Sequence, residues 1–298
     1  MSVVLCTIAL NEMEFLPKLW QQHKDWPEMV HWVFVESADS VYANCNPELV
    51  TSQGLSTDGT SEFLRGLAVN NRNVTYIPLG FCEDVDPAKG KKAARQRCLD
   101  SASHWEPEVF IHLDADEFYT FADQAKLLQV MRALPEYDSF VFPKREIWHP
   151  PSLACTRFDD GTKLSTTLFA FEAVGGFWGI PCCHWWRWRP GLTHNDCHNT
   201  PTRADGKPLN VLGVDVRDLK ERFPDPPQMI HMGYAASAVT RRAKVRYYEE
   251  RGEKDDENRK WYVQSRSAWR RWTPGTKLPH KAEVVEYQGP VPECFNDL

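Results

Sequence analysis

The chain has 298 residues, of which 42% are hydrophobic and 26% charged, as in a soluble globular protein with a substantial core. Its net charge of −6 argues against a protein whose whole surface binds nucleic acid or anionic lipid. The apolar run at residues 3–10 is too short to cross a bilayer, and no basic residue precedes it. We therefore expect no signal peptide and no integral membrane association.

The cysteines favour a reducing compartment. Their number is odd, nine, and most are scattered singly along the chain. Without an export signal, free thiols are a better interpretation than a disulfide framework. We expect a cytoplasmic protein.

The first half of the chain alternates between two hydrophobic patterns. Short apolar runs predict buried strands, and apolar residues three or four apart predict amphipathic helices. This alternation is typical of βαβ units, so the sequence predicts an α/β fold with a mostly parallel sheet. Strands are predicted at residues 3–10, 31–36, 74–79, 109–113 and 139–143, and helices at 15–23, 60–68, 87–103 and 127–134.

The pattern changes after residue 143. Residues 144–230 are rich in proline, glycine and tryptophan and have little periodicity, which predicts loops and short strands. Residues 235–272 are helical in pattern and basic. We therefore divide the chain into residues 1–143, a second region at 144–234, and a helical extension with a tail at 235–298.

Two acidic residues directly follow the predicted strand at 109–113. Asp114 and Asp116 are two positions apart, so they project to the same side while the chain stays extended. The carboxyl end of a parallel strand is where α/β proteins bind ligands. Repulsion between the two carboxylates is relieved when a divalent cation binds both. An acidic turn is the simpler alternative.

Other polar clusters also follow predicted strands. Asn11-Glu12 follows the first strand, and residues 36–39 (ESAD) end the second. These strand ends share one edge of a parallel sheet, where acids can hydrogen-bond ribose hydroxyls or a base. The basic residues at 89–95 can present cations, or a helix N-terminus, to phosphates.

The order of these segments resembles the nucleotide-sugar-binding half of GT-A fold glycosyltransferases, especially the family 2 type. The resemblance covers about residues 3–143. It is carried by the Asn-Glu pair, residues 36–39, STDGT at 56–60, AARQR at 93–97 and LDADE at 113–117. It implies a Rossmann-like three-layer sandwich in which residues 1–143 bind the nucleotide sugar.

The resemblance also implies an activity. The enzyme would transfer a hexose or N-acetylhexosamine from a nucleoside diphosphate sugar, most simply a UDP-sugar, to a hydroxyl of a glycan or of a modified nucleic-acid base. Mn²⁺ or Mg²⁺ would bridge the two phosphates and stabilise the leaving diphosphate. Asp114 and Asp116 would face the metal and the donor, Glu36 and Asp39 would hold the nucleoside, Asp58 would border the base, and Arg95 would contact the donor.

A late histidine fits the same resemblance. Many GT-A enzymes carry a histidine downstream of the DxD pair that completes the metal shell, and His231 in the segment HMGY is similar. A neutral imidazole suits Mn²⁺ better than Mg²⁺. The alternative is a core histidine before a glycine turn.

The general base is less defined. An inverting transferase needs a carboxylate beside the acceptor hydroxyl, and family 2 members place it between the DxD pair and the late histidine. Asp196 is the first candidate, and Glu172 and Glu146 are alternatives. The Glu-Asp dipeptide usual in the family is absent from this region, so both inverting and retaining mechanisms stay open.

Three further patterns allow other interpretations. Cys182, Cys183, His184, His194, Cys197 and His198 are of zinc-ligand types, but their spacing is not that of a zinc finger. Trp178, Trp185, Trp186 and Trp188 would line the acceptor side or, for at least two of them, pack in the core. Interleaved cations and aromatics at 241–272 leave open a non-catalytic carbohydrate- or nucleic-acid-binding module. A nucleotidyltransferase on a related scaffold is the other alternative.

Overall fold

The computed structural model describes residues 1–82, 87–140, 144–148, 169–173, 185–189, 191–194, 201–203, 209–212, 219, 221–234, 238–250, 285–286 and 292–295. The first half contains β1 (Val3–Ala9), α1 (Leu16–His23), β2 (Met29–Ala38), α2 (Ser40–Cys45), α3 (Thr60–Asn70), β3 (Val74–Phe81), α4 (Pro87–Ala102), β4 (Val109–His112), β5 (Glu117–Phe118), α5 (Phe121–Ala133) and β6 (Ser139–Phe140). The second half contains β7 (Lys144–Trp148), β8 (Phe169–Ala173), β9 (Trp185–Arg187), β10 (Leu192–His194), β11 (Pro201–Arg203), β12 (Val211–Leu212), β13 (Met229–Tyr234), α7 (Ala238–Glu250) and β14 (Val285–Glu286).

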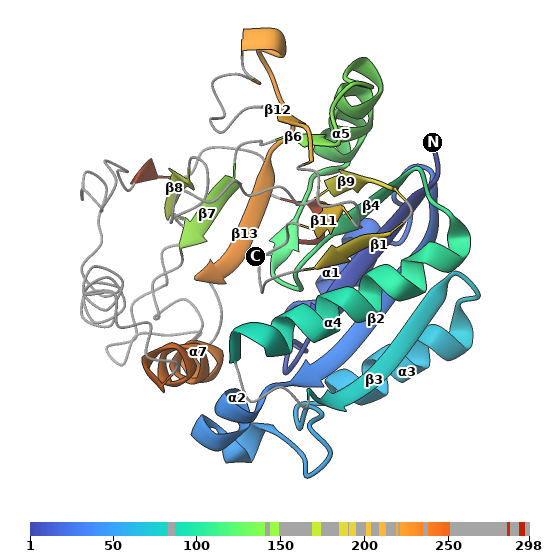
Figure 1. The fold of residues 1–298 in the computed structure, drawn as a ribbon. Helices are drawn as coiled ribbons and strands as arrows, with labels where there is room; N and C mark the ends of the chain where they lie inside the picture. The colour runs from blue at the N-terminus through green and yellow to red at the C-terminus, as the bar shows by residue number, and fades with distance from the viewer. Residues whose placement is uncertain are drawn as a thin grey trace.

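A five-stranded sheet with the order β3-β2-β1-β4-β9 forms the centre of the fold (Figure 1). Strands β3, β2, β1 and β4 are parallel to their neighbours, and only the edge strand β9 is antiparallel, to β4. The predicted α/β fold with a mostly parallel sheet is therefore confirmed. The predicted strand at 139–143 is not part of this sheet, because β6 pairs with β12 in a separate two-stranded ribbon.

Helices cover both faces of this sheet. Val3 and Leu5 of β1 pack in one apolar cluster with side chains of α1 and α3, among them Leu19 and Leu64. The alternate residues of the strand lie in another cluster with Ala94, Cys98 and Ala102 of α4. A strand buried on both faces needs a continuous apolar run, and this explains why residues 3–6 do not alternate with polar ones. The arrangement is the predicted three-layer sandwich.

A second five-stranded sheet has the order β14-β8-β7-β13-β5. Its strand β5 precedes residue 143 in the chain, whereas β9 of the first sheet follows it. Each sheet therefore contains a strand from the other side of the boundary predicted at residue 143. In the second sheet, β7 and β13 are parallel, and the other pairs are antiparallel.

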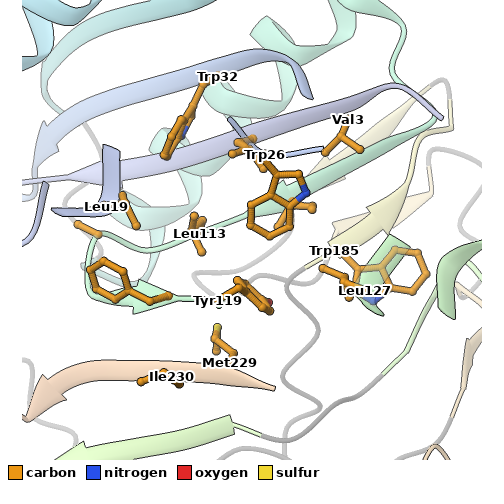
Figure 2. Close-up of a cluster of buried hydrophobic side chains, with 14 of the residues drawn as sticks. Val3, Leu19, Trp26, Trp32, Leu113, Tyr119, Leu127, Trp185, Met229 and Ile230 are labelled. Carbon is orange, nitrogen blue, oxygen red and sulfur yellow. The ribbon is translucent and has the colours of Figure 1, made fainter. Parts of the chain in front are cut away.

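The main core joins the two sheets. Trp32 of β2, Tyr119 after β5, and Met229 and Ile230 of β13 are buried in one cluster (Figure 2). Trp185, on β9, is also fully buried there, and Trp186 packs on the opposite face with Phe110. The prediction that these two tryptophans line the acceptor side is wrong, and the core alternative holds. Burial of each indole removes a large apolar surface from water, which stabilises the fold.

Two predictions from composition concern the described residues. Their cysteines, Cys6, Cys45, Cys82, Cys98 and Cys294, are all free thiols, as expected. None of the helices in the described ranges has the length and apolar character needed to cross a membrane.

Candidate functional site

The loop between β4 and β5 carries Asp114 and Asp116 from the first sheet to the second. The backbone carbonyl of Asp116 accepts a hydrogen bond of 2.7 Å from the amide of Met232 on β13. Two residues of β5 then pair with β13, so that Glu117 lies opposite His231. The loop is thus held by both sheets, and it brings His231 beside Asp116. Of the three residues predicted as metal ligands, Asp116 and His231 are in contact, whereas Asp114 lies on the same loop and contacts Arg95.

Hydrogen bonds within the turn orient its side chains. The amide of Asp114 donates to Oε2 of Glu117 at 3.0 Å, and the amide of Glu117 donates to the carbonyl of Asp114 at 3.0 Å. Glu117 is itself buried. The third acid of the LDADE segment therefore stabilises the turn that presents the other two.

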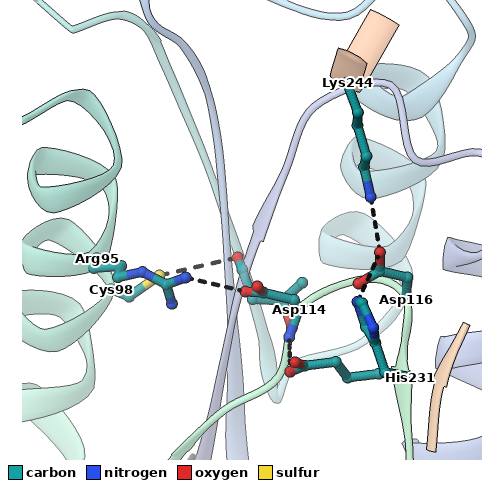
Figure 3. A network of polar contacts seen from close by, with 8 residues as sticks. Arg95, Cys98, Asp114, Asp116, His231 and Lys244 are labelled. Atoms are coloured by element: carbon teal, nitrogen blue, oxygen red, sulfur yellow. Dashed lines mark hydrogen bonds and ion pairs between the residues drawn. The ribbon is translucent and has the colours of Figure 1, made fainter. Parts of the chain in front are cut away.

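Asp116 is a buried carboxylate with a cationic partner. Nζ of Lys244, on α7, lies 2.8 Å from its Oδ2, and Nε2 of His231 lies 3.4 Å from the same oxygen (Figure 3). Only 7% of the Asp116 side chain is exposed. Burial favours the protonated acid, but Lys244 and His231 outweigh it and hold the pKa of Asp116 well below its ordinary value. The carboxylate is therefore charged at neutral pH.

Asp114 has a separate cationic partner. Nη2 of Arg95, on α4, lies 3.4 Å from Oδ1 of Asp114, on the side of the turn away from Lys244 (Figure 3). The Arg95 side chain is 5% exposed and that of Asp114 is 34% exposed. Arg95 thus has little surface to offer a donor directly. Its observed contact is with the aspartate.

The metal prediction can be compared with this geometry. Among the residues that the structure describes, no three His, Cys, Asp or Glu side chains lie close enough to hold an ion. Oδ2 of Asp116 already accepts from Lys244, and Asp114 faces Arg95. The repulsion that a divalent ion was expected to relieve is relieved by two basic side chains. As it stands, this donor set does not fit a divalent cation.

Glu12 is a site residue that the sequence analysis placed at this edge of the sheet without assigning it an individual role. Its Oε2 is buried and has no hydrogen-bond partner in the described part of the chain. Burial raises the pKa of Glu12 to about 8; Lys244 opposes this rise, and Asp116 and Asp114 add to it. Glu12 thus lies in the electrostatic field of the same loop. Its position directly after a parallel strand was the available signal.

Asn11 holds Glu12 in place. The backbone of Asn11 has a φ of 55°, in the left-handed region that asparagine tolerates better than most residues. Its Nδ2 donates to the carbonyl of Leu49 at 2.7 Å, and its Oδ1 accepts from the amide of Thr57 at 3.1 Å. These bonds tie the end of β1 to the loop that contains the STDGT segment.

Glu36 has a different environment from the one predicted. It is fully buried, and it accepts hydrogen bonds from the amide of Ser56 at 2.7 Å, from Oγ of Ser61 at 2.8 Å and from the hydroxyl of Tyr76. A carboxylate without accessible surface cannot contact a nucleoside unless the loop opens. The predicted nucleoside contact is corrected on this ground: Glu36 holds the loop at residues 56–61 in place.

Asp39 and Asp58 also accept from the chain itself. Asp39 caps α2 through the amide of Tyr42 at 2.8 Å and accepts from the hydroxyl of Tyr247 at 2.7 Å. Asp58 accepts from the amides of Met13 and Thr60, each at 3.0 Å, and remains exposed. Of the three acids predicted for the nucleoside, Asp58 is therefore the one on the surface.

Strand register separates two candidates for the general base. Glu146 of β7 is paired with His231 of β13. Glu172 of β8 is paired with Arg145, the residue that precedes Glu146 on β7. The register therefore favours Glu146 over Glu172 as the neighbour of His231. Asp196 lies outside the described residues, as do five of the six predicted zinc-type residues; for the sixth, His194, the structure describes only the backbone.

No protein family model matches the chain, and no curated protein does. A crystal structure of S. aureus TarS 1-349 is similar, with a TM-score of 0.35 and 15% identity over 49% of this chain and 36% of that one. The same fragment in complex with UDP-GlcNAc gives a TM-score of 0.32 at 16% identity, over 49% and 35% of the two chains. A CMP:2-keto-3-deoxy-manno-octonic acid synthetase complexed with CTP gives 0.30 at 10% identity, over 53% and 56%.

The chain thus spans between about a third and somewhat over half of the length of these structures. Similarities with such TM-scores carry no argument about activity.

Proposed function

We propose that this protein is a glycosyltransferase of the GT-A type that transfers a sugar from a nucleoside diphosphate sugar to a hydroxyl group. One observation carries the proposal. Asp114 and Asp116 lie in the loop at the carboxyl end of a parallel strand, and Nε2 of His231, on the second sheet, lies 3.4 Å from Oδ2 of Asp116. The carboxyl edge of a parallel α/β sheet is where such proteins usually bind nucleotides, and this supports the proposal.

The reaction breaks the bond between the sugar and the diphosphate, so negative charge develops on the leaving diphosphate. Groups that stabilise this charge lower the barrier, and preorganised charges do so with little rearrangement. The loop presents two acid–base pairs, Asp114 with Arg95 and Asp116 with Lys244, from two different helices. The donor we favour is a UDP-linked hexose or N-acetylhexosamine, as the family resemblance implies.

A base is also required if the reaction inverts the configuration of the sugar. It would take the proton of the acceptor hydroxyl as that oxygen attacks. Glu146 has the register position nearest to His231, and Asp196 remains the candidate from the sequence. The predicted Mn²⁺ or Mg²⁺ stays a prediction; in the described geometry, Oδ2 of Asp116 accepts from Lys244.

Donor hydrolysis without an acceptor tests the proposal. A panel of UDP-, GDP-, CMP- and dTDP-sugars is incubated with the wild type, Asp116→Asn and Asp100→Asn, each with and without Mn²⁺. Asp100 is an exposed acid on α4, and its substitution controls for the loss of one carboxylate. We expect slow release of nucleotide from one donor, a loss of at least about tenfold in Asp116→Asn, and no change in Asp100→Asn.

The absence of both donor hydrolysis and nucleotide binding would contradict the proposal. If no donor is hydrolysed, and no nucleotide in the panel raises the melting temperature, the transferase proposal fails. A binding module would then be the better interpretation, because it does not need this constellation.

A further inference from the structure

Lys244 is placed between a buried acid and solvent. Its Nζ lies 2.8 Å from Oδ2 of Asp116, and 35% of its side chain is exposed against 7% for the aspartate. The ammonium group donates a hydrogen bond to Asp116. The pair therefore presents its cationic member outward at the edge of the sheet.

The position of Lys244 does not depend on this ion pair alone. The hydroxyl of Tyr247 donates to Asp39, and Nδ2 of Asn46 donates to the carbonyl of Ala243 at 3.3 Å. Tyr247 and Ala243 are also buried. These contacts dock α7 against α2 and the residues that follow it, and they fix the point from which Lys244 extends.

The charges of the site call for a cation at this point. A nucleoside diphosphate brings negative charge to an edge that already carries Asp114 and Asp116. In the candidate site, the observed counter-charges come from Arg95 and Lys244, and Arg95 is almost fully buried against Asp114. Lys244 is the more accessible of the two. A lysine ammonium is a suitable point charge for phosphate oxygens.

We propose that Lys244 binds the diphosphate of the donor nucleotide and supplies the charge neutralisation that the family resemblance assigns to a divalent ion. Asp116 then acts as a positioning residue that orients the ammonium group. This inference rests on the proposed function, since it presumes a nucleotide-sugar donor. It implies that nucleotide binds without a divalent ion and that binding weakens as salt screens the charge.

Calorimetric titration with UDP and with inorganic diphosphate tests the inference. Both are titrated into the wild type and into Lys244→Met, Lys244→Arg and Arg246→Met, in a chelator and then with Mn²⁺. Arg246→Met is the matched control, because it removes one positive charge from the same helix. Its ion pair with Glu48 is on the surface, with side chains 43% and 53% exposed, and so contributes little to the docking of α7. Circular dichroism and melting curves of each variant establish that it is folded.

If the inference is correct, the wild type binds both probes in chelator. Lys244→Met weakens both at least tenfold, Lys244→Arg recovers part of the loss, and Arg246→Met stays within twofold of the wild type. Uridine affinity is the same in all four proteins, because the nucleoside carries no phosphate.

Two results overturn the inference while leaving the transferase proposal intact. One is binding that requires Mn²⁺ and vanishes in chelator, and the other is equal affinity of the wild type and Lys244→Met. If no nucleotide of the donor panel binds under either condition, the proposed function itself fails, and the inference fails with it.

Discussion

Lys244 and Asp116 form an ion pair 2.8 Å long although 128 residues separate them in the sequence. The aspartate is nearly closed to solvent, so the removal of the lysine would leave a buried carboxylate without its main counter-charge. The pair also connects α7 to the loop that joins the two sheets. A helix outside the predicted nucleotide-binding half thereby contributes to the candidate site.

Two glycines should respond to alanine in opposite directions. Gly54 has a φ of +78°, and a Cβ there would lie 2.4 Å from the amide nitrogen of Phe81. Gly66, within α3, has no atom within 4 Å of such a Cβ. We expect Gly54→Ala to lower the free energy of unfolding by about 2 kcal/mol or more, and Gly66→Ala to raise it by about 0.5–1 kcal/mol. Urea denaturation measures both, and effects of equal sign would contradict the assignment.

The buried carboxylate of Glu36 should stabilise the protein. Glu36→Ala leaves the amide of Ser56 and the hydroxyls of Ser61 and Tyr76 without their acceptor. We expect a loss of about 3 kcal/mol in the free energy of unfolding, because each buried donor left unpaired costs about 1–3 kcal/mol. Glu62→Ala, an exposed acid on α3, is the control and should change stability by less than about 0.5 kcal/mol. A loss as small as that of the control would mean that Glu36 is not a structural acid.

His23 should make stability depend on pH. The side chain is fully buried, and burial lowers its pKa from 6.5 to about 3. Between these values the unfolded chain binds a proton that the folded chain does not, so stability falls as pH decreases from 6.5 and is complete above it. We therefore expect the free energy of unfolding to decrease by about 2 kcal/mol between pH 7 and pH 5.

His23→Gln replaces the titrating imidazole with a neutral polar side chain. Its stability, measured by chemical denaturation at pH 7 and pH 5, should change less between the two values than that of the wild type. His104→Gln, on the surface, should keep the wild-type difference. Identical pH dependence of His23→Gln and the wild type would show that His23 is protonated in the fold.

Asn11 should contribute to stability both through its left-handed backbone conformation and through its side-chain hydrogen bonds. Asn11→Gly keeps access to the left-handed φ but loses the bonds to Leu49 and Thr57, whereas Asn11→Ala loses both. We expect stability to decrease from wild type to Asn11→Gly to Asn11→Ala, with about 1 kcal/mol between the two variants from backbone conformation. Thermal denaturation gives the order. An alanine variant as stable as the glycine variant would show that the φ is relaxed.

Much of the first sheet could be predicted because its signals are local. Four predicted strands and the helices between them agree with the structure to within a few residues, since apolar periodicity is set by neighbouring positions. The strand at 139–143 was assigned to the wrong sheet because an apolar run does not specify its partner. Trp185 and Trp186 were likewise ambiguous, since composition does not distinguish a core indole from a binding surface.

The residues of the candidate site likewise differ in how far the sequence could predict them. The resemblance implied that Asp114, Asp116 and His231 share a site; the structure brings His231 into contact with Asp116, and Asp114 lies on the same loop. Glu36 was predicted to bind a nucleoside because nothing in the sequence shows which donors surround it. The three donors that enclose its carboxylate, at Ser56, Ser61 and Tyr76, come from segments distant from it in the chain. Lys244 belonged to a basic, aromatic-rich segment that the sequence connected only with carbohydrate or nucleic-acid binding.

The sequence by itself determined the alternation of strands and helices, the parallel sheet, and the acidic turn after β4. These follow from side-chain periodicity and from the polarity of residues adjacent in the chain. Only the tertiary structure decided which cation neutralises each acid, because Arg95 and Lys244 reach Asp114 and Asp116 from helices docked on different sides of the loop. Charge pairing depends on distance in space, and the packing of α7 on α2 sets that distance.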